Sequence, residues 1–146
     1  MSTQYDKNNY KAWHNLGLLN YKYFEVLKSS EKNETILNYA FNSILGFTKS
    51  VCIGGKNISK TLQDILRIID VWFIMGQEET IDKLVFKSFD TIDIDTWLLV
   101  IPQLLARVNI KDERIKNTLS KLLTKIGLTH PRALIYPYII IIIILD

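Results

Sequence analysis

The sequence LQDILRIIDVWFIMG, residues 62–76, contains the clearest helical pattern in the chain. Its apolar residues recur every three or four positions, as on one face of an amphipathic helix. They are Leu62, Ile65, Leu66, Ile69, Trp72 and Phe73. Gly76 follows the pattern, and we predict that it ends this helix in a left-handed C-terminal cap. The stretch therefore predicts a helix with one face in a core that buries Trp72.

The same spacing recurs before and after residues 62–76, and no stretch alternates as a strand would. The further apolar stripes are Ala12-Leu16-Leu19-Tyr23-Val26, Ile36-Tyr39-Ala40-Ser43-Ile44-Phe47-Val51, Ile81-Leu84-Val85-Ser88 and Ile115-Leu119-Leu122-Leu123-Ile126. Residues from about Thr96 to Val108 are apolar on more than one side, so we predict a fifth helix there that is the most buried. Pro131 suits the first position of a seventh helix. The pattern thus predicts an all-α fold of about seven helices.

Turn and cap residues punctuate these stripes. Gly54-Gly55 and Gly127 follow stripes and are predicted, like Gly76, to adopt left-handed caps. Asp95 and Asp112 precede the fifth and sixth helices, where their side chains can cap the first turn. Pro102 and Pro137 fall within helical patterns, so each is expected to kink its helix.

The spacing of the helices indicates how they assemble. From the second helix on, helices start roughly every 20 residues, so two of them form a hairpin of about 35 to 45 residues. Antiparallel hairpins of this size stack into an α-solenoid of the TPR/HEAT type. Neither end carries an obvious polar cap, so we expect a piece of a longer array. A helical bundle complete in itself is the alternative.

We divide the chain into a helical-repeat segment, residues 1–138, and a low-complexity tail, residues 139–146. The tail contains six consecutive isoleucines, Ile139 to Ile144. Its apolar run is too short for a membrane span, which needs about 20 residues. A buried helix is one interpretation of the tail, and a membrane anchor is another.

Composition narrows the class of protein. The 146 residues are 48% hydrophobic and 23% charged, with a net charge of +3, which suits one soluble domain and argues against nucleic acid as a partner. The polar start of the chain has no secretory leader, so we expect a cytoplasmic protein. Cys52 is the only cysteine, and its apolar neighbours predict a buried, inert thiol.

A search for catalytic residues finds none. The Asp-Phe-Gly and His-Arg-Asp motifs of protein kinases do not occur in the sequence. His14 and His130 lie far apart without neighbouring ligands, so we expect structural roles and no metal site. Asp90, Asp93 and Asp95 fit helix capping better than a calcium loop. We therefore expect no catalytic residue and no cofactor.

The predicted sixth helix is basic on its outer face. The residues concerned are Lys111, Arg114, Lys116, Lys121 and Lys125. A solvated helix face accounts for them, and an acidic protein partner is the alternative.

Several longer motifs resemble one family, the target of rapamycin kinases. Tyr10-Lys11-Ala12-Trp13-His14 is similar to the start of the closing part of their FAT region. Residues 62–76, Asp95 to Arg107, and Ile126 to Pro137 are similar to later blocks of that region, in the same order. The matching residues that we assign structural roles are Trp13, Leu62, Trp72, Phe73, Trp97, Pro102, Gln103, His130, Pro131, Tyr136 and Pro137. After Pro137 the isoleucine run departs from the family pattern.

The resemblance implies a role that the helical pattern alone does not. A FAT region is a helical scaffold that holds and regulates a kinase domain, which this chain lacks. The implied partners are proteins: that kinase domain, neighbouring helical repeats and the subunits of a regulatory complex, through which the protein can lie peripheral to endomembranes. The resemblance also implies an inositol polyphosphate site, for which Lys11 is the one candidate residue. A free-standing helical adaptor for other proteins is the alternative function.

Overall fold

The computed structural model describes residues 9–54 and 57–135, and within these residues the chain forms helices and their connections without strands. The helices are α2 (Tyr10–Leu27), α3 (Glu34–Gly54), α4 (Ile58–Met75), α5 (Glu79–Thr91), α6 (Ile94–Leu98), α7 (Ile101–Leu105) and α8 (Glu113–Thr129). Residues 131–135 are helical as well. Pro131 thus begins a helix, as predicted.

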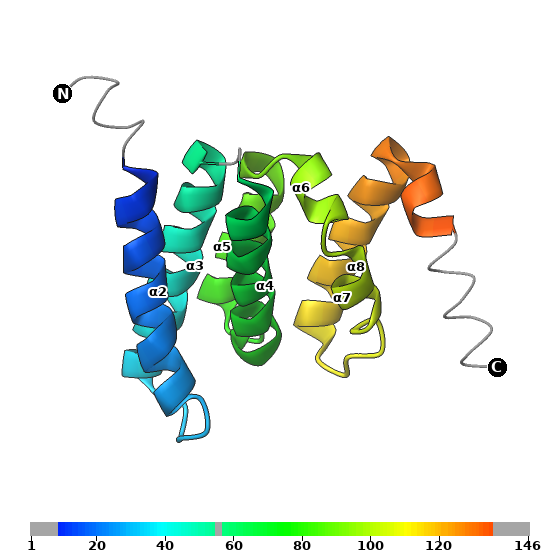
Figure 1. Ribbon diagram of the computed structural model, residues 1–146. Coiled ribbons are helices and arrows are strands. Elements are labelled where there is room, and N and C mark those ends of the chain that lie inside the picture. The colour runs from blue at the N-terminus through cyan, green and yellow to red at the C-terminus, as the bar shows by residue number, and fades with distance from the viewer. Residues whose placement is uncertain (1–8, 55–56, 136–146) are drawn as a thin grey trace.

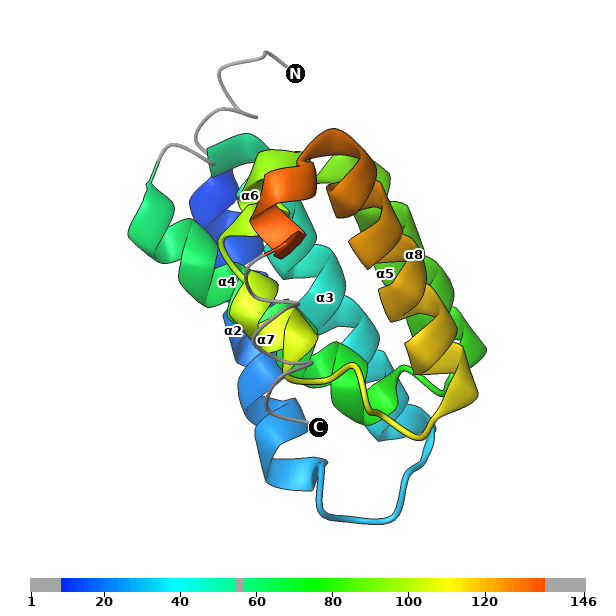
Figure 2. The ribbon, with the colours of Figure 1, turned by 90° about the vertical axis from the view of Figure 1, so that its right-hand side faces the viewer.

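The helices stack as three antiparallel hairpins in two layers. Figure 1 shows α2, α4 and α7 in one layer and α3, α5 and α8 behind them. The view in Figure 2, turned by 90°, separates the same two layers. The hairpins are α2–α3, α4–α5 and α6/α7–α8, so the predicted α-solenoid is confirmed.

Aromatic side chains form the centre of the core. Trp72 and Trp97 are fully buried, as predicted, and Phe89 lies between them. The ring centroids of Phe89 are 5.8 Å from Trp72 and 5.4 Å from Trp97, and both contacts are edge-to-face. Phe73 stacks on Trp72 at 4.8 Å. These four residues, named here the aromatic row, join α4, α5 and α6.

Two glycines bring α2 and α3 into backbone contact. A Cβ atom added at Gly46 would lie 2.6 Å from the backbone nitrogen of Gly17, and one added at Gly17 would lie 2.8 Å from the Phe47 ring. No side chain fits between the helices at this crossing. The two helices of the first hairpin can approach this closely because neither glycine has a side chain.

The left-handed conformation predicted for Gly76 and Gly127 is wrong, because the described glycines show no positive φ. Gly76 is nevertheless the C-cap of α4, so the predicted end of that helix is confirmed. Gly76 follows α4 with φ −70°, which is right-handed. A Cβ atom there would lie 2.7 Å from the Ile115 side chain, so close approach of α8 explains this glycine. Gly127 lies inside α8. Of the predicted pair after α3, Gly54 is the last residue of that helix, and Gly55 lies outside the described residues.

The predicted fifth helix is two short helices, not one kinked helix. Pro102 sits at the start of α7, because its missing N–H group is tolerated there but not within a continuous helix. The N-cap of α6 is Asp93, whose side chain accepts from the Asp95 amide, so the cap predicted at Asp95 is wrong. Leu99, Pro102 and Gln103 are exposed, and this stretch is therefore not the most buried. The cap predicted at Asp112 is confirmed, with 3.0 Å to the Ile115 amide.

The apolar stripe predicted on the first helix faces away from the described core. Four of its residues, named here the outer stripe, are between 40% and 74% exposed: Leu16, Leu19, Tyr23 and Val26. Gly17 and Phe24 are buried instead. Gly17 permits the backbone contact with α3, and the face that carries it turns inward. Leu18, Tyr21 and Leu27 of the same helix pack against the core.

Two further observations bear on the expectations from sequence. Cys52 is exposed, so the prediction of a buried thiol is wrong; its Sγ atom lies 3.2 Å from the Thr91 carbonyl oxygen. Partial burial still raises the pKa of this thiol. Among the described residues, no helix combines the length and apolarity that crossing a bilayer requires.

Candidate functional site

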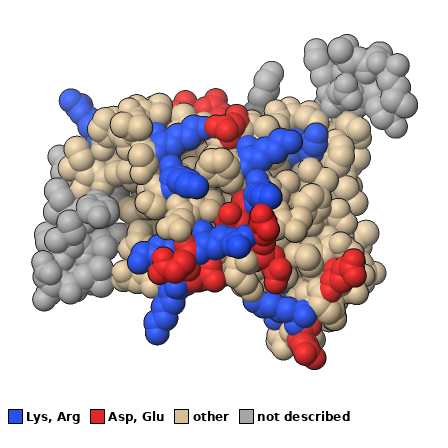
Figure 3. Space-filling model, turned by 180° about the vertical axis from the view of Figure 1, so that it is seen from behind, with Lys and Arg blue, Asp and Glu red and all other residues tan. Residues whose placement is uncertain are grey.

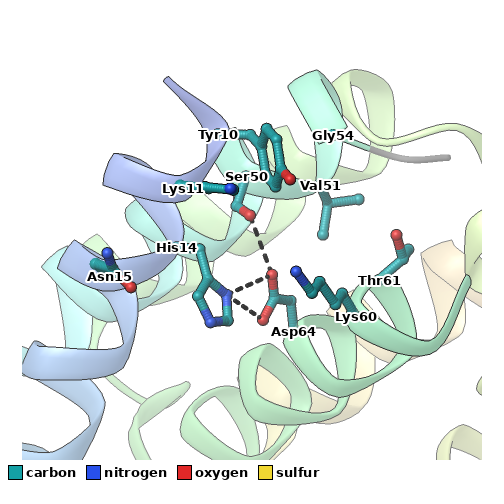
Figure 4. Close-up of a pocket in the computed structure, with 10 residues that line it drawn as sticks. All are labelled: Tyr10, Lys11, His14, Asn15, Ser50, Val51, Gly54, Lys60, Thr61 and Asp64. Carbon is teal, nitrogen blue, oxygen red and sulfur yellow. Dashed lines mark hydrogen bonds and ion pairs between the residues drawn. The ribbon is translucent and has the colours of Figure 1, made fainter. Parts of the chain in front are cut away.

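A pocket of about 200 Å³ lies where the start of α2, the end of α3 and the start of α4 meet. Figure 4 shows the side chains that line it. The ones that matter for its chemistry are Tyr10, Lys11, His14, Ser50, Lys60 and Asp64. We call it the α2–α4 pocket. It contains Lys11, the residue that sequence motifs single out as a ligand candidate.

A buried carboxylate, Asp64, forms one wall of the α2–α4 pocket and joins three helices. His14 of α2 lies with Nδ1 2.9 Å from one carboxylate oxygen. Ser50 of α3 donates to the other oxygen at 3.1 Å. Arg67, one turn along α4, lies 3.4 Å away. A buried charge needs such partners, so this network stabilises the packing of the first three helices.

The arrangement of His14, Ser50 and Asp64 does not form a nucleophilic triad. In a triad the serine hydroxyl donates to the histidine, and the carboxylate orients the far side of the imidazole ring. Here Ser50 donates to Asp64, and His14 contacts the same carboxylate. The Ser50 hydroxyl is therefore bonded to a carboxylate, and not to a histidine as in a triad. The expected structural role of His14 therefore agrees with its contacts.

Two lysines give the α2–α4 pocket a positive rim. Lys11 from α2 and Lys60 from α4 both line the pocket, and Figure 4 shows them reaching it from different helices. Lys60 lies in the first turn of α4, after the N-cap Asn57 that accepts from its amide. A helix N-terminus also favours an anion. The structure thus places a second basic residue, Lys60, beside Lys11, which the sequence motif identifies.

Sequence analysis missed Lys60, although a signal for it exists. In a stack of antiparallel hairpins, the first helices of successive hairpins run parallel. Their N-terminal turns therefore lie at the same edge of the stack. A lysine in the first turn of α2 and another in the first turn of α4 are neighbours for that reason, despite their separation in sequence.

Most of the motif residues contribute to the fold. Leu62 is partly buried, and Trp72, Phe73 and Trp97 form three of the four members of the aromatic row. Trp13 is half-buried, with the Lys49 ammonium 5.6 Å from its ring centroid. Pro102 begins α7, and Gln103 is exposed.

The remaining motif residues lie near the end of the described structure. His130 precedes the helix at residues 131–135, and its Nε2 atom lies 2.8 Å from Asp95. Tyr136, Pro137 and the run from Ile139 to Ile144 lie outside the described residues. Residues 9–54 and 57–135 contain no cluster of three or more side chains arranged to bind a metal ion.

Comparisons with known proteins place these features in a family. Residues 1–70 match the FAT domain family. The chain is 36% identical to the serine/threonine-protein kinase tor1 of Schizosaccharomyces pombe in an alignment that covers 92% of this chain and 6% of that protein. It is 33% identical to the serine/threonine-protein kinase mTor of Drosophila melanogaster, over 93% of this chain and 6% of that protein. It is 29% identical to the serine/threonine-protein kinase TOR2 of Saccharomyces cerevisiae, over 97% of this chain and 7% of that protein.

The two kinds of match agree with the order of the motifs and with the helical stack. The chain spans only a small part of the length of the curated relatives that it matches. The family match begins at residue 1 and ends within α4, and the relatives extend the similarity through α8. This chain therefore belongs to the target of rapamycin family, in which it corresponds to the FAT region.

Proposed function

We propose that this chain is a non-catalytic scaffold segment of a target-of-rapamycin-like protein kinase. Its role is to support and regulate a kinase domain that lies elsewhere in such a protein. Its partners are proteins, namely neighbouring helical repeats, the kinase domain and regulatory subunits, and its place is the cytoplasm. The outer stripe of α2 is the observation that carries this proposal.

The outer stripe has the form of a helix-packing seam. Its residues are spaced by three, four and three positions, which places them in one line along α2. Tyr23 is held by a stacked contact with Tyr39 of α3, with 5.1 Å between ring centroids. An apolar seam of this length along a helix is typical of a surface that another helix covers. A neighbouring repeat supplies such a helix in an α-solenoid.

Self-association of the isolated chain tests the proposal. With the outer stripe uncovered, we expect concentration-dependent oligomers in sedimentation velocity. Leu19→Lys combined with Val26→Lys should convert these oligomers to monomers without lowering the thermal midpoint, because both side chains are exposed. Ile58→Lys, at an exposed apolar residue outside the stripe, is the matched control and should leave the oligomers unchanged. A wild-type chain that is monomeric throughout would count against the proposal.

A second experiment separates the scaffold from a free-standing adaptor. Capture from extract of the organism's own cells should recover the tagged protein together with kinase polypeptide. Recovery of other partners without any kinase chain would favour the adaptor.

The α2–α4 pocket supports a more specific ligand, an inositol polyphosphate. Lys11 and Lys60 bring two ammonium groups to one pocket, while Arg67 lies 3.4 Å from Asp64 and offsets its charge. Inositol hexakisphosphate should raise the thermal midpoint of the chain, and Lys11→Glu or Lys60→Glu should abolish that rise. Lys22→Glu, on an exposed part of α2, is the control for net charge. An equal loss in the control would show that the effect is not specific to the pocket.

A further inference from the structure

A groove of about 330 Å³ lies between α5 and α8, away from both the outer stripe and the α2–α4 pocket. Its principal residues are Phe86, Phe89, Asp90, Lys121, Thr124 and Lys125. We call it the α5–α8 groove. It lies in the layer of α3, α5 and α8, and Figure 3 shows the molecule from that side, with basic side chains over the middle of the face and acidic ones among them.

The floor of the α5–α8 groove is aromatic. Phe89 is buried and contacts both tryptophans of the aromatic row. Phe86, one turn earlier on α5, packs edge-to-face on Phe89 with 5.9 Å between centroids, yet it remains 45% exposed. The core thus holds an aromatic ring at the surface in a fixed orientation. A ring presented in this way gives an apolar side chain a defined place to pack.

Two lysines of α8 border this ring. The Lys121 ammonium lies 5.0 Å from the Phe86 ring centroid, which is a cation–π contact. Lys125 donates to the Phe89 carbonyl oxygen at 2.7 Å and to the Asp90 carboxylate at 2.8 Å. These bonds hold Lys125 in place and neutralise Asp90. The groove therefore keeps a net positive charge beside an exposed aromatic surface.

We propose that the α5–α8 groove binds a short acidic segment of a partner protein that carries one large apolar side chain. The apolar side chain packs on Phe86, and a flanking carboxylate pairs with Lys121. The size of the groove, near the lower end for binding pockets, suits one anchoring side chain. Charge complementarity selects the acidic residues around that anchor.

The charges and rings of the groove favour a peptide over single-stranded nucleic acid. Proteins that bind single strands stack successive bases on several aromatic side chains along a basic track. Among the described residues of the groove, Phe86 is the one exposed ring, and Asp90 would lie against a phosphate backbone. A single exposed ring beside Lys121 matches one apolar side chain next to an acidic residue. Tighter binding of single-stranded nucleic acid than of the peptide would therefore count against the proposal.

Fluorescence anisotropy with the full chain tests the proposal. The probe is a labelled eight-residue peptide with acidic residues on both sides of one phenylalanine. Lys121→Glu should weaken binding by about tenfold or more, since it replaces a charge-assisted contact by repulsion. Phe86→Ser should weaken binding as well. Lys116→Glu is the matched control, because Lys116 is exposed on the same helix, does not line the groove and changes net charge equally.

Four results would overturn the proposal. They are an equal loss in Lys116→Glu, undiminished binding of a probe with alanine for phenylalanine, tighter binding of a single-stranded oligonucleotide of the same length, and no measurable binding of the probe by the wild type. Circular dichroism checks that each variant is folded. If Lys121→Glu unfolds the chain, Lys121→Gln replaces it and should still weaken binding. The outer-stripe variants leave this groove intact, so failure here is separate from failure of the scaffold proposal.

Discussion

The first and last hairpins of the stack pack by opposite means, one through direct backbone contact and the other through a large buried side chain. In the α2–α3 hairpin two unbroken helices touch at Gly17 and Gly46, where no side chain separates their backbones. In the last hairpin the first member is broken into α6 and α7, and its contact with the core depends on Trp97. Packing in the first hairpin thus depends on two glycines, and packing in the last hairpin depends on Trp97.

The difference shows what each hairpin can tolerate. A contact between backbones loses its geometry when an atom is added, because helices cannot move apart locally without losing the contacts on either side. A contact made by a large side chain loses burial when atoms are removed, because the cavity collapses only in part. Additions should therefore damage the first hairpin, and deletions the last.

The largest effect should follow deletion in the last hairpin. Trp97→Ala should lower the free energy of unfolding by about 3–5 kcal/mol, because it removes a fully buried side chain that packs on Phe89. Trp13→Ala, at a half-buried tryptophan of the first hairpin, is the comparison and should cost less. Chemical denaturation monitored by circular dichroism measures both. Equal losses would remove the distinction between the two hairpins.

An intermediate effect should follow addition in the first hairpin. Gly46→Ala should cost about 1–3 kcal/mol, because its Cβ atom would lie 2.6 Å from the Gly17 nitrogen. Gly127→Ala is the control within a helix. Among the described residues, its Cβ atom would meet only the Leu134 side chain, at 3.2 Å. Alanine also favours a helix by about 0.5–1 kcal/mol over glycine. Thermal melts should show Gly46→Ala melting lower and Gly127→Ala unchanged or higher.

The smallest effect concerns the caps of the last hairpin. Asp112→Ala should cost about 1 kcal/mol, because the Asp112 side chain accepts from the Ile115 amide at the start of α8. Asp95→Ala should cost less, since the contact of the Asp95 carboxylate within the described structure is an exposed ion pair with His130. Denaturant midpoints at matched buffer conditions compare the two. A larger loss at Asp95 would contradict the cap assignment of Asp93.

Much of the fold follows from local sequence signals. The spacing of apolar residues predicts the helices, and the regular spacing of the helices predicts hairpins in a solenoid. What local signals do not predict is which face of α2 turns inward. That choice depends on the match between Gly17 and Gly46 across two helices, and neither glycine has a distinctive neighbourhood in sequence. The break between α6 and α7 is equally non-local, because Pro102 allows either a kink or a new helix start.

The candidate sites were less predictable than the fold. Lys11 was identified through a motif, whereas Lys60 and Asp64 join it only through the packing of three helices. The basic face of α8 is evident from the sequence. Phe86, however, comes from α5 and lies outside the apolar stripe predicted for that helix. Local patterns thus predict which residues are basic, and tertiary packing decides which of them share a surface.

The aromatic row also gives the protein a built-in optical probe. Trp72 and Trp97 are fully buried, and their indole N–H groups have no acceptor among the described residues. Their emission should therefore lie at short wavelength and change when the junction of α4, α5 and α6 opens. Trp13, partly exposed beside Lys49 of α3, should emit at longer wavelength and respond to changes in the contact between α2 and α3. One emission spectrum can thus distinguish events at the first hairpin from events in the core.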